Sequence, residues 1–470
     1  MHPEDRVPGR IRLWSLTEDV LIEVGPGGTH LVAFSQWGEV RIDGTSPVVC
    51  ESLLRLGLGP MSVENLPVVR AAPAQAGGPR VDESTEGWRQ FERVLDRLGN
   101  CVVQSLGLDD EGGPVLSVVP VSRQARFERP PVVAAERPVR LSRFAAIRAG
   151  DGELVVESPV ASHRVVLHRP TAVRVVGELG RPRTVADLAT RLTTPEPVLT
   201  DVLAYLVAAG VVVTAEPNGP VRFAEDDDPG LVPWAPSDLQ FHAHSRMGQQ
   251  HGRAGPPVRR PPTAAAGRRR PDGPRLQLHR PAGPHPPYPA PTELIEISGR
   301  HGDYAADPVT AEQLGELLFR AVGGTDLDEL ELYVSADRCV GLPRGSYSYH
   351  PGEHALGPVN DSEPELVELL DLAKVAAGSR WRPPVLITAT TQIARLSWLH
   401  SGMAYAATLQ HVGAVQQNLT LVATAMGLAS TALAGGEGAI VDEALRLDWP
   451  TEVSIGEFII GARSRRPGGD

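Results

Sequence analysis

The sequence is poor in lysine and cysteine, and each shortage excludes a class of chemistry. Of the 45 basic residues only Lys374 is lysine, so a mechanism that needs a lysine side chain has one candidate. The three cysteines, Cys50, Cys101 and Cys339, are widely spaced and odd in number. They match neither a disulfide framework nor a paired-cysteine zinc site, so we expect a reducing, cytoplasmic setting.

Long apolar runs are also missing, although 41% of the residues are hydrophobic. No stretch approaches the roughly 20 apolar residues that a membrane-spanning helix needs. The opening MHPEDRVPGR is too polar for a signal peptide, and we expect no membrane contact. The net charge of −12 argues against a general nucleic-acid coat, and 470 residues are too many for a single hydrophobic core.

Alternating apolar and polar residues mark the N-terminal part of the chain. Short strand-like runs occupy residues 9–45, and a helix is predicted over 46–59. An amphipathic helix at 86–99 then leads into two strands within 101–121. This order of elements predicts a winged-helix-like, peptide-clamp-like domain over residues 1–125.

A similar order recurs over residues 126–228. Two strands are predicted within 153–170, and a strand that starts a wing follows Gly210. Thr184 stands three residues before Asp187, which is the pattern of a capping box at the start of a helix. Three helices are expected, at 171–180, 184–192 and 195–210. The pattern predicts a second winged-helix domain.

Winged helices most often bind DNA, but the third helix of this unit does not suit that role. It contains Glu196 and Asp201 and no Arg or Lys, which contacts with phosphates and guanines require. The alternative is a peptide-docking module, in which an extended peptide adds to a sheet edge against a helix. We prefer this alternative. The candidate peptide-binding residues are Val165, Val166 and Leu167 on the strand, with Val202 and Tyr205 on the helix.

A connecting segment, 229–292, separates these domains from the last one. Within it, residues 248–290 hold eleven prolines and eight arginines against one acid, with few large apolar residues. Such a composition cannot bury enough surface to order itself, so we predict a disordered linker. A basic arm that docks an acidic peptide is the alternative.

Residues 293–463 are predicted to form one α+β domain, followed by a disordered tail at 464–470. Strand patterns and amphipathic helices alternate along it, and a hairpin is expected around HPGEH at 350–354. The apolar run 402–433 is predicted to be two helices or one bent helix. A helix that is apolar nearly all round must be covered on every side, often by a second subunit.

Four blocks of this last domain resemble a known family, the SagB/ThcOx-type dehydrogenases, whose catalytic domain has the nitroreductase fold. The blocks are ELELYVSADRCVGLPRGSYSYHPGEHAL, WLHSGMAY, GAVQQNLTLVATAMGLASTALAGG and VSIGEFIIG. The segment WAPSDLQFHAHSRMG is similar to the connection between the peptide-clamp region and the oxidase domain of those proteins. The resemblance covers roughly residues 230 to 463 and implies an α+β fold with a C-terminal nitroreductase-like domain.

The resemblance also implies a reaction. Members of this family oxidise thiazolines and oxazolines in ribosomal precursor peptides to thiazoles and oxazoles, and FMN accepts the hydride. They are dimers in which both subunits line each flavin pocket. The partners implied are a precursor peptide, a cyclodehydratase, and either a flavin-bearing homologue or a second copy of this chain, whereas nucleic acid and membrane are not expected.

Three places depart from the family pattern. In the segment that would bind the flavin phosphate, the chain keeps Arg300 but has Gly299 and Gly302 where the family usually has basic residues. A phosphate dianion needs hydrogen-bond donors and positive charge, so this is a loss. In the flavin loop the family's glycines survive as Gly323 and Gly324, but three acids follow them. These acids are Asp326, Asp328 and Glu329.

The third departure falls at the expected catalytic pair. Where the family has Trp-Lys-Tyr, this chain has Trp398, Leu399 and His400. Leucine cannot move a proton, whereas His400 could act as a base near neutral pH or simply fill a helix position. Lys374 lies on an amphipathic helix and is expected in solvent. Tyr405 is a second catalytic candidate, with interface core as the alternative.

Several further residues are candidate flavin contacts. Amides within an apolar helix must have partners, which could be the flavin ring or the facing subunit. The glycines after that helix could let backbone N–H groups approach a phosphate or could simply end the helix. These candidates are Gln416, Gln417, Asn418, Gly435 and Gly436. His350 and His354 lie four apart in a hairpin without supporting ligands, so no metal site is predicted.

Two hypotheses follow. In the first, the chain is an FMN-dependent azoline dehydrogenase with an altered pocket in which His400 is the base. In the second, it has lost catalysis and serves as the peptide-recruiting partner of a homologue that holds most of the FMN at the shared interface. One cause would then explain all three departures, so the second hypothesis is preferred. A DNA-binding regulator is a remote third.

Overall fold

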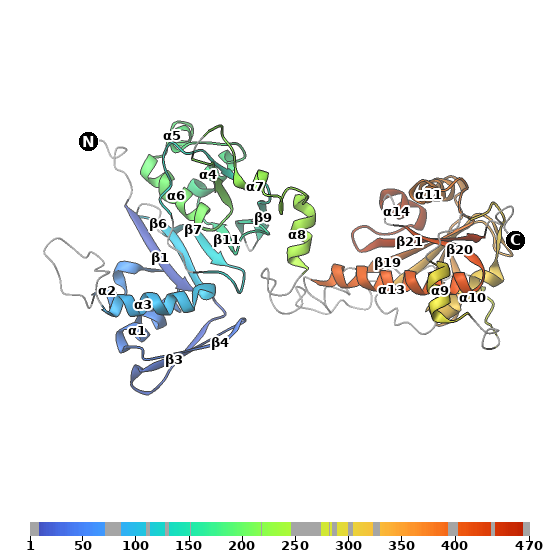
Figure 1. The fold of residues 1–470 in the computed structure, drawn as a ribbon, viewed down its shortest axis with the longest axis horizontal. Coiled ribbons are helices and arrows are strands. Elements are labelled where there is room, and N and C mark those ends of the chain that lie inside the picture. The colour runs from blue at the N-terminus through green and yellow to red at the C-terminus, as the bar shows by residue number, and fades with distance from the viewer. Residues whose placement is uncertain are drawn as a thin grey trace. The chain divides into compact units, whose positions relative to one another are not determined.

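The chain forms two compact units, residues 1–252 and 253–470, which are drawn in Figure 1. The computed structural model describes residues 9–70, 86–109, 113–126, 131–150, 152–217, 219–245, 274–281, 283, 289–298, 304–322, 330–392, 403–433 and 438–463. Both units mix helices with antiparallel sheet, which confirms the α+β class. Within these ranges, no helix combines the length and the apolar character that crossing a bilayer requires.

A seven-stranded sheet organises the N-terminal unit, and every neighbouring pair of its strands is antiparallel. In spatial order the strands are β5 (Met61–Ser62), β1 (Arg10–Leu16), β6 (Val102–Leu108), β7 (Gly113–Pro120), β11 (His163–Leu167), β10 (Glu153–Glu157) and β9 (Ala146–Gly150). The strands β1, β6 and β7 come from the first predicted domain and β9 to β11 from the second. One sheet therefore joins the two segments.

Two smaller sheets and several helices complete this unit. The sheets pair β2 (Leu21–Val24), β3 (His30–Ser35) and β4 (Gly38–Asp43), and β8 (Val139–Leu141) with β12 (Val212–Thr214). The helices are α1 (Pro47–Leu56), α2 (Pro67–Arg70), α3 (Glu86–Arg97), α4 (Pro170–Glu178), α5 (Val185–Leu192), α6 (Glu196–Ala208), α7 (Ala224–Asp227) and α8 (Pro236–His244). Short 3-10 turns lie at Pro26–Gly28, Val63–Asn65 and Gly99–Cys101.

Two hydrophobic cores hold the N-terminal unit together. One packs α1 and α3 against β1 and the sheet of β2, β3 and β4. In this core the rings of Trp14 and Trp88 stack with 6.1 Å between their centroids. The other buries α4, α5 and α6 against β6, β7, β10 and β11. The predicted capping box is present, since the Thr184 hydroxyl accepts the Asp187 N–H at 3.2 Å and the Asp187 carboxylate accepts the Thr184 N–H at 2.9 Å.

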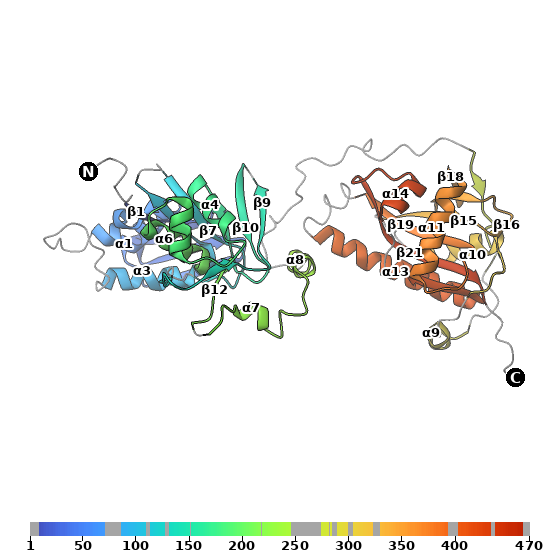
Figure 2. The same ribbon diagram turned by 90° about the horizontal axis from the view of Figure 1, so that it is seen from above.

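The last helix of this unit, α8, is held at the β9 and β10 end of the large sheet, as Figure 2 shows. Buried Glu157 on β10 accepts one hydrogen bond from Gln240 Nε2 at 3.2 Å and lies 3.6 Å from His244 Nε2; both residues are on α8. Arg148 on β9 completes the cluster with an ion pair of 3.0 Å to the same carboxylate. The His244 and Arg148 contacts lower the pKa of Glu157 to about 2, and the Glu157 contact raises the pKa of His244.

The C-terminal unit is built on a second seven-stranded sheet. Its spatial order is β13 (Leu276–Gln277), β18 (Ala355–Asn360), β17 (Gly345–His350), β15 (Glu331–Ala336), β19 (Val385–Gln392), β21 (Glu452–Ala462) and β20 (Leu428–Leu433). A parallel pair, β14 (Val309–Thr310) and β16 (Cys339–Val340), lies apart from it. The helices are α9 (Pro291–Ser298), α10 (Ala311–Val322), α11 (Glu363–Ala376), α13 (Ala404–Ala425) and α14 (Gly438–Leu445).

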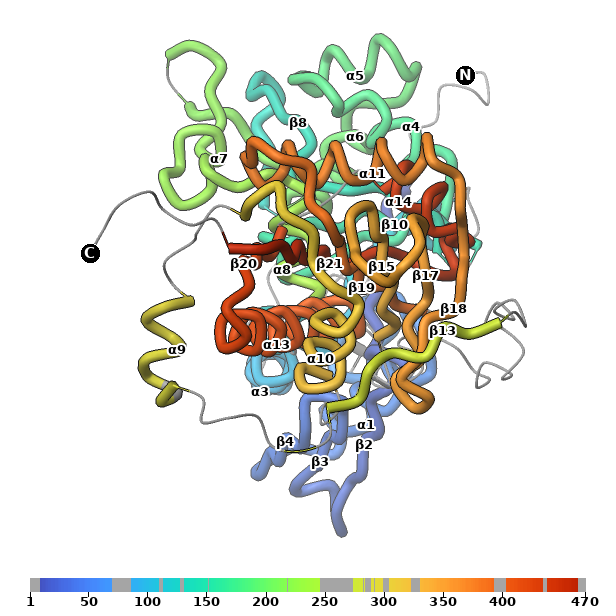
Figure 3. Tube along the Cα trace, turned by 90° about the vertical axis from the view of Figure 1, so that its right-hand side faces the viewer, coloured from blue at the N-terminus to red at the C-terminus, as the bar shows by residue number. Residues whose placement is uncertain are grey.

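Helices cover both faces of this sheet, as Figure 3 shows. On one face α10 and α13 pack over Val334, Ile387 and Ile460. On the other face α11 and α14 pack over Leu386 and Ile459. Strands that are covered on both sides are buried throughout, which explains the nearly continuous apolar stretches at 385–389 and 458–460.

The prediction that residues 402–433 are entirely helical is wrong at their C-terminal end. Helix α13 stops at Ala425, Gly427 adopts φ +70°, and Leu428–Leu433 forms β20 along β21. Glycine allows this left-handed turn at little cost. A run that is apolar throughout has no period, so its pattern cannot separate a buried helix from a buried edge strand.

The predicted disordered linker also contains an ordered stretch. Leu276 and Gln277 form β13, which pairs with Leu356 and Ala355 of β18. The next residue, Leu278, is buried in the core of the C-terminal unit. The prediction of disorder over 248–290 is therefore wrong for these residues. Even in a Pro- and Arg-rich segment, a short stretch is ordered when its backbone pairs with a sheet edge and one leucine is buried in the core.

Candidate flavin and peptide sites

The three predicted amides of α13 point to different surroundings. Gln416 donates through Nε2 to the backbone oxygen of Glu457 on β21 at 3.0 Å. Asn418 donates to the backbone oxygen of Ala321 near the end of α10 at 3.5 Å, while Gln417 is exposed. Gln416 and Asn418 therefore fasten α13 to its own unit, and of the three only Gln417 faces outward.

Tyr405 stands on the first turn of α13, where its side chain is 42% exposed together with Leu409 at 37%. Helix α13 extends past the sheet at this end (Figure 1). An exposed aromatic residue and leucine on one face of a helix are suited to an interface. This exposure is compatible with interface core, and both predicted roles of Tyr405 stay predictions.

The remaining predicted flavin and catalytic residues lie outside the described part of the chain. They are Arg300, Gly323, Gly324, His400, Gly435 and Gly436. Their connections are nevertheless defined, since Gly323 directly follows α10 and His400 stands four residues before the first residue of α13. Their roles stay predictions.

The described residues of the C-terminal unit do not by themselves assemble a phosphate site. Most of their arginines are engaged with carboxylates, as in the pairs Arg320–Glu316 at 2.8 Å, Arg344–Asp337 at 2.7 Å, Arg382–Asp371 at 2.8 Å and Arg446–Glu365 at 3.1 Å. A phosphate dianion needs several donors that are not already satisfied in this way. These four arginines are therefore already occupied, and the residues that would hold a flavin phosphate stay a prediction.

Strand β21 carries two buried glutamates that the sequence pattern did not indicate. Glu452 is 4% exposed and accepts hydrogen bonds from the Tyr333 hydroxyl at 3.0 Å and the Thr390 hydroxyl at 2.6 Å. Glu457 is also 4% exposed, and burial raises its pKa. Acids in an alternating strand usually mark a solvent face, but helices cover both faces of this sheet, so the pattern alone could not find these residues.

His354 is a structural residue of the predicted hairpin. Its Nε2 lies 2.9 Å from the His279 backbone oxygen, which can only accept, so Nε2 carries the hydrogen and Nδ1 accepts from the Tyr349 hydroxyl at 2.8 Å. Burial lowers the pKa of His354, in keeping with a neutral ring. Both nitrogens are thus occupied. Among the residues that the structure describes, no group of three potential ligands could hold a metal ion.

The predicted peptide-binding strand has no free edge in this structure. Val165 to Leu167 on β11 pair with Val118 to Leu116 of β7 on one side and with Val156 to Leu154 of β10 on the other. Val165, Leu167 and the helical Val202 are buried in the core beneath α4 to α6. Addition of a peptide strand alongside β11 would require β7 or β10 to leave.

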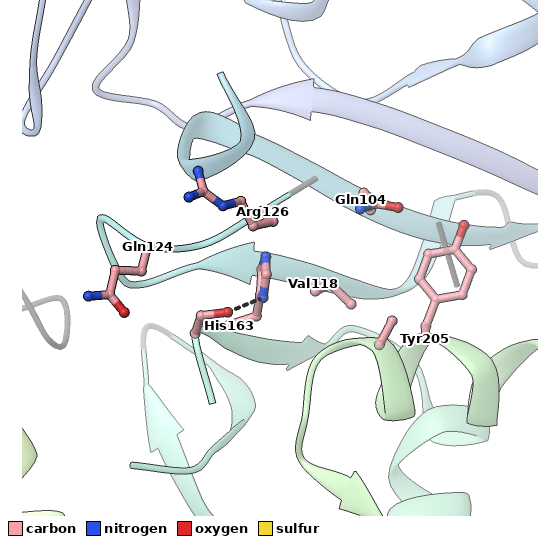
Figure 4. A pocket seen from close by; sticks show the side chains of 8 residues that line it. Gln104, Val118, Gln124, Arg126, His163 and Tyr205 are labelled. Atoms are coloured by element: carbon pink, nitrogen blue, oxygen red, sulfur yellow. Dashed lines mark hydrogen bonds between the residues drawn. The ribbon is translucent and has the colours of Figure 1, made fainter. Parts of the chain in front are cut away.

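Tyr205, the fifth predicted peptide-binding residue, instead lines a small cavity of about 90 Å³ (Figure 4). The lining residues are Gln104, Val118, Gln124, Arg126, Ser162, His163, Tyr205 and Ala208. Gln104 and Tyr205 are buried, whereas Gln124 and Arg126 are exposed. The cavity therefore has a polar floor between β6 and α6 and a polar rim that carries a cation.

The residues of this cavity come from both predicted N-terminal domains. Gln104, Val118 and Gln124 lie in residues 1–125, and the others lie in residues 126–228. The large sheet brings them together by pairing β7 with β11 in the register Pro120 to His163. No motif of either segment alone could indicate this site.

Two family models match the chain. The cyanobactin oxidase ThcOx model matches residues 139–251, and the nitroreductase family model matches residues 300–462. The chain is therefore similar to the ThcOx oxidase over one region and to the nitroreductase family over another. This result confirms the resemblance that the sequence blocks indicated. The ThcOx region includes α4, α5, α6 and α8, and the nitroreductase domain includes the whole C-terminal sheet except β13.

Individual proteins are also similar to part of this chain. A protein of Methanocaldococcus jannaschii named as a nitroreductase is 27% identical over 156 residues, which cover 31% of this chain and 76% of that protein. Among solved structures, a nitroreductase of Ralstonia eutropha has a TM-score of 0.33 at 17% identity and covers 44% of this chain and 96% of its own.

Two further solved structures are similar at the same level. A nitroreductase of Anabaena variabilis has a TM-score of 0.33 at 19% identity, with 37% of this chain and 38% of that chain covered. The E. coli microcin synthetase McbBCD complex, solved with truncated pro-MccB17 bound, has a TM-score of 0.32 at 18% identity. In that case 40% of this chain and 78% of the other are covered.

Proposed function

We propose that this chain is a subunit of an FMN-dependent azoline dehydrogenase complex, in which it recruits the precursor peptide and pairs with a flavin-bearing homologue. The complex would oxidise thiazolines or oxazolines of the peptide to thiazoles or oxazoles. The observation that carries the proposal is the order of a ThcOx region followed by a nitroreductase domain in one chain.

The non-catalytic role is supported by what the nitroreductase domain lacks. The family's lysine is replaced by Leu399, and the segment expected to bind the flavin phosphate retains Arg300 beside two glycines. The arginine pairs described above leave few cationic donors for a phosphate among the residues of this unit that the structure describes. FMN would then be held largely by the partner, at an interface that includes the outward face of α13 around Tyr405 and Gln417.

The second candidate is an active homodimer of this chain, with His400 as the base. The observation in its favour is that a histidine stands beside the position of the missing lysine and four residues before the start of α13. A DNA-binding role is not favoured, because α6 contains no Arg or Lys and buries Val198, Leu199 and Val202 in the core.

The purified chain tests the two candidates. Made alone, it is expected to be colourless and to leave a synthetic thiazoline-containing peptide unchanged. Made together with a nitroreductase-type homologue, it is expected to copurify as a yellow complex that removes two hydrogen atoms from the peptide, as mass spectrometry would show. A yellow, active preparation of the chain alone would contradict the proposal and establish the homodimer.

His400→Ala is the matched test of the second candidate. In an active homodimer with His400 as base, this variant keeps its flavin colour and loses at least tenfold in turnover, since general bases contribute about 100-fold or more. In the proposed heterodimer the same substitution leaves turnover within about twofold. Glu368→Ala, on the exposed face of α11, is the control in both cases.

A further inference from the structure

The cavity between β6, β11 and α6 has the chemistry of a receptor for a negative charge. Its polar lining consists of one arginine, one histidine, one tyrosine, two glutamines and one serine, and no acid lines it in the described part of the chain. A carboxylate that leaves bulk water needs N–H and O–H donors and, where possible, a cation. Arg126 supplies the cation at the rim.

Tyr205 supplies a donor at the floor. Burial raises the pKa of its phenol to about 12, so the hydroxyl keeps its hydrogen at neutral pH. That hydrogen points to the Ser105 backbone oxygen over 3.4 Å, which is long for an O–H···O bond and therefore weak. A closer acceptor in the cavity would capture it at little cost.

The surrounding charges also favour an anion. Arg12 acts on the Tyr205 phenol and lowers its pKa against the larger effect of burial. Asp201, one helical turn before Tyr205, has the opposite effect, but its carboxylate is paired with Arg10 at 2.9 Å. The acid that acts on the phenol is thus largely neutralised by Arg10, whereas Arg12 and Arg126 add positive charge.

The volume of the cavity limits the size of the group that it can bind. About 90 Å³ is well below the roughly 300 Å³ at which sites for whole small molecules begin, so the cavity accommodates one short side chain. Val118 and Ala208 provide apolar walls for the methylene groups of such a side chain, as Figure 4 shows for Val118 beside the polar residues.

We propose that this cavity binds the carboxylate of one Asp or Glu side chain of the precursor peptide. Arg126 would pair with the carboxylate at the rim, and Tyr205 would donate to it from the floor. The inference rests on the proposed peptide-recruiting function and specifies the chemistry that selects the peptide. It differs from the β11 edge mode, because a side chain enters a preformed cavity and no strand of the sheet has to leave.

A randomised peptide library tests the inference with the full chain. The peptides are acetylated at the N-terminus and made in two sets, with either an amidated or a free C-terminus. Captured peptides are sequenced, and one is resynthesised with its enriched acid and with the matching amide. We expect an acid at one internal position in both sets and at least tenfold weaker binding of the amide peptide, about 1.4 kcal/mol.

Variants of the chain identify the receptor. Arg126→Gln and Tyr205→Phe are expected to remove the preference for the acid over the amide peptide. Arg123→Gln is the matched control, because Arg123 lies in the same segment, is exposed and does not line the cavity. A circular dichroism spectrum of each variant checks that it is folded.

Each other outcome overturns the inference in a recognisable way. Captured peptides without an acid preference, or a preference that survives in both variants, would exclude the cavity while peptide recruitment stands. Enrichment only with a free C-terminus would assign the cavity to a chain end. Capture of no peptide would overturn both the inference and the recruiting role, whereas the flavin and mass experiments judge the dehydrogenase complex independently.

Discussion

At the scale of single residues, burial and hydrogen-bond geometry decide which polar side chains are structural. His354 is 1% exposed and both of its ring nitrogens are bonded, whereas its sequence neighbourhood resembles a metal-ligand pair with His350. Spacing alone cannot separate these cases. What distinguishes them is the backbone oxygen of His279, which comes from a distant stretch of the chain.

His354→Ala is therefore expected to destabilise the C-terminal unit by about 2 to 4 kcal/mol, since it leaves a cavity and two unsatisfied polar groups. Denaturant unfolding measures this, with exposed Glu368→Ala within about 0.5 kcal/mol of the parent as control. An equal effect of the two substitutions would contradict the structural role.

The same residue gives a pH dependence with a defined sign. The pKa of His354 is lowered in the folded chain, so its contribution is fully present above its usual pKa of about 6.5 and is lost as pH falls through the lower folded value. Stability of the C-terminal unit should fall on acidification below that point more steeply in the parent than in His354→Phe. Parallel profiles from pH 7 to 5 would contradict this.

At the scale of elements, close approach of backbones positions the helices. Helix α13 crosses β21 at Gly456, where an added Cβ would lie 2.5 Å from Val412 Cγ1 and 3.2 Å from Gln416 Nε2. The crossing holds α13 in place and leaves the face around Gln417 outward. A glycine in a strand pattern suggests such an approach but does not name the partner helix.

Gly456→Ala is expected to cost about 1 to 3 kcal/mol, because Val412 is branched and must shift. Gly456→Ala should cost less in a chain that already carries Val412→Ala than it does in the parent. A double-mutant cycle of unfolding free energies measures this difference. Gly413→Ala on the exposed side of α13 meets no neighbouring atom and should stabilise by about 0.5 to 1 kcal/mol. Simple additivity at 456 and 412 would refute the contact.

The docking of α8 has two pH limits. Glu157 has a lowered pKa, so its contribution is present above its usual value of about 4.5 and is lost as pH falls toward about 2. His244 has a raised pKa, so its contribution is present below about 6.5 and is lost as pH rises through the higher folded value.

Hydrogen exchange of the α8 amides, corrected for the intrinsic rate at each pH, should therefore be slowest between about pH 4.5 and 6.5. Glu157→Gln should remove this optimum, while exposed Glu216→Gln leaves it unchanged. An α8 protection factor that does not vary with pH in the parent would show that the cluster does not hold the helix.

At the scale of the whole molecule, the core boundaries define the autonomous pieces. Both N-terminal cores lie between Trp14 and Val212, and the large sheet of that unit shares no strand with the C-terminal one. The first two predicted domains, in contrast, share one sheet and one cavity. Their sequences repeat a similar order of elements, but strand pairing between them makes a single unit.

A chain of residues 1–252 should consequently fold by itself and melt cooperatively, as circular dichroism would show. A chain of residues 126–252 should not, because it lacks β7, which pairs with β11, and β6, which packs with β7 against α6. A shorter chain that melts as sharply as the longer one would contradict this prediction.

Residue patterns alone determined most of the local structure: the helices from α3 to α6, the Thr184 cap and many strands of the C-terminal unit. They also indicated the similarity to the ThcOx and nitroreductase families. These follow from periodicity, caps and motifs, which depend on neighbours in sequence. Tertiary structure decided the end of α13 at Gly427, the docking of Leu276 to Leu278, the buried glutamates of β21 and the cavity around Tyr205. Each of these depends on strand pairing or on burial by distant elements, and a sequence pattern does not contain such contacts.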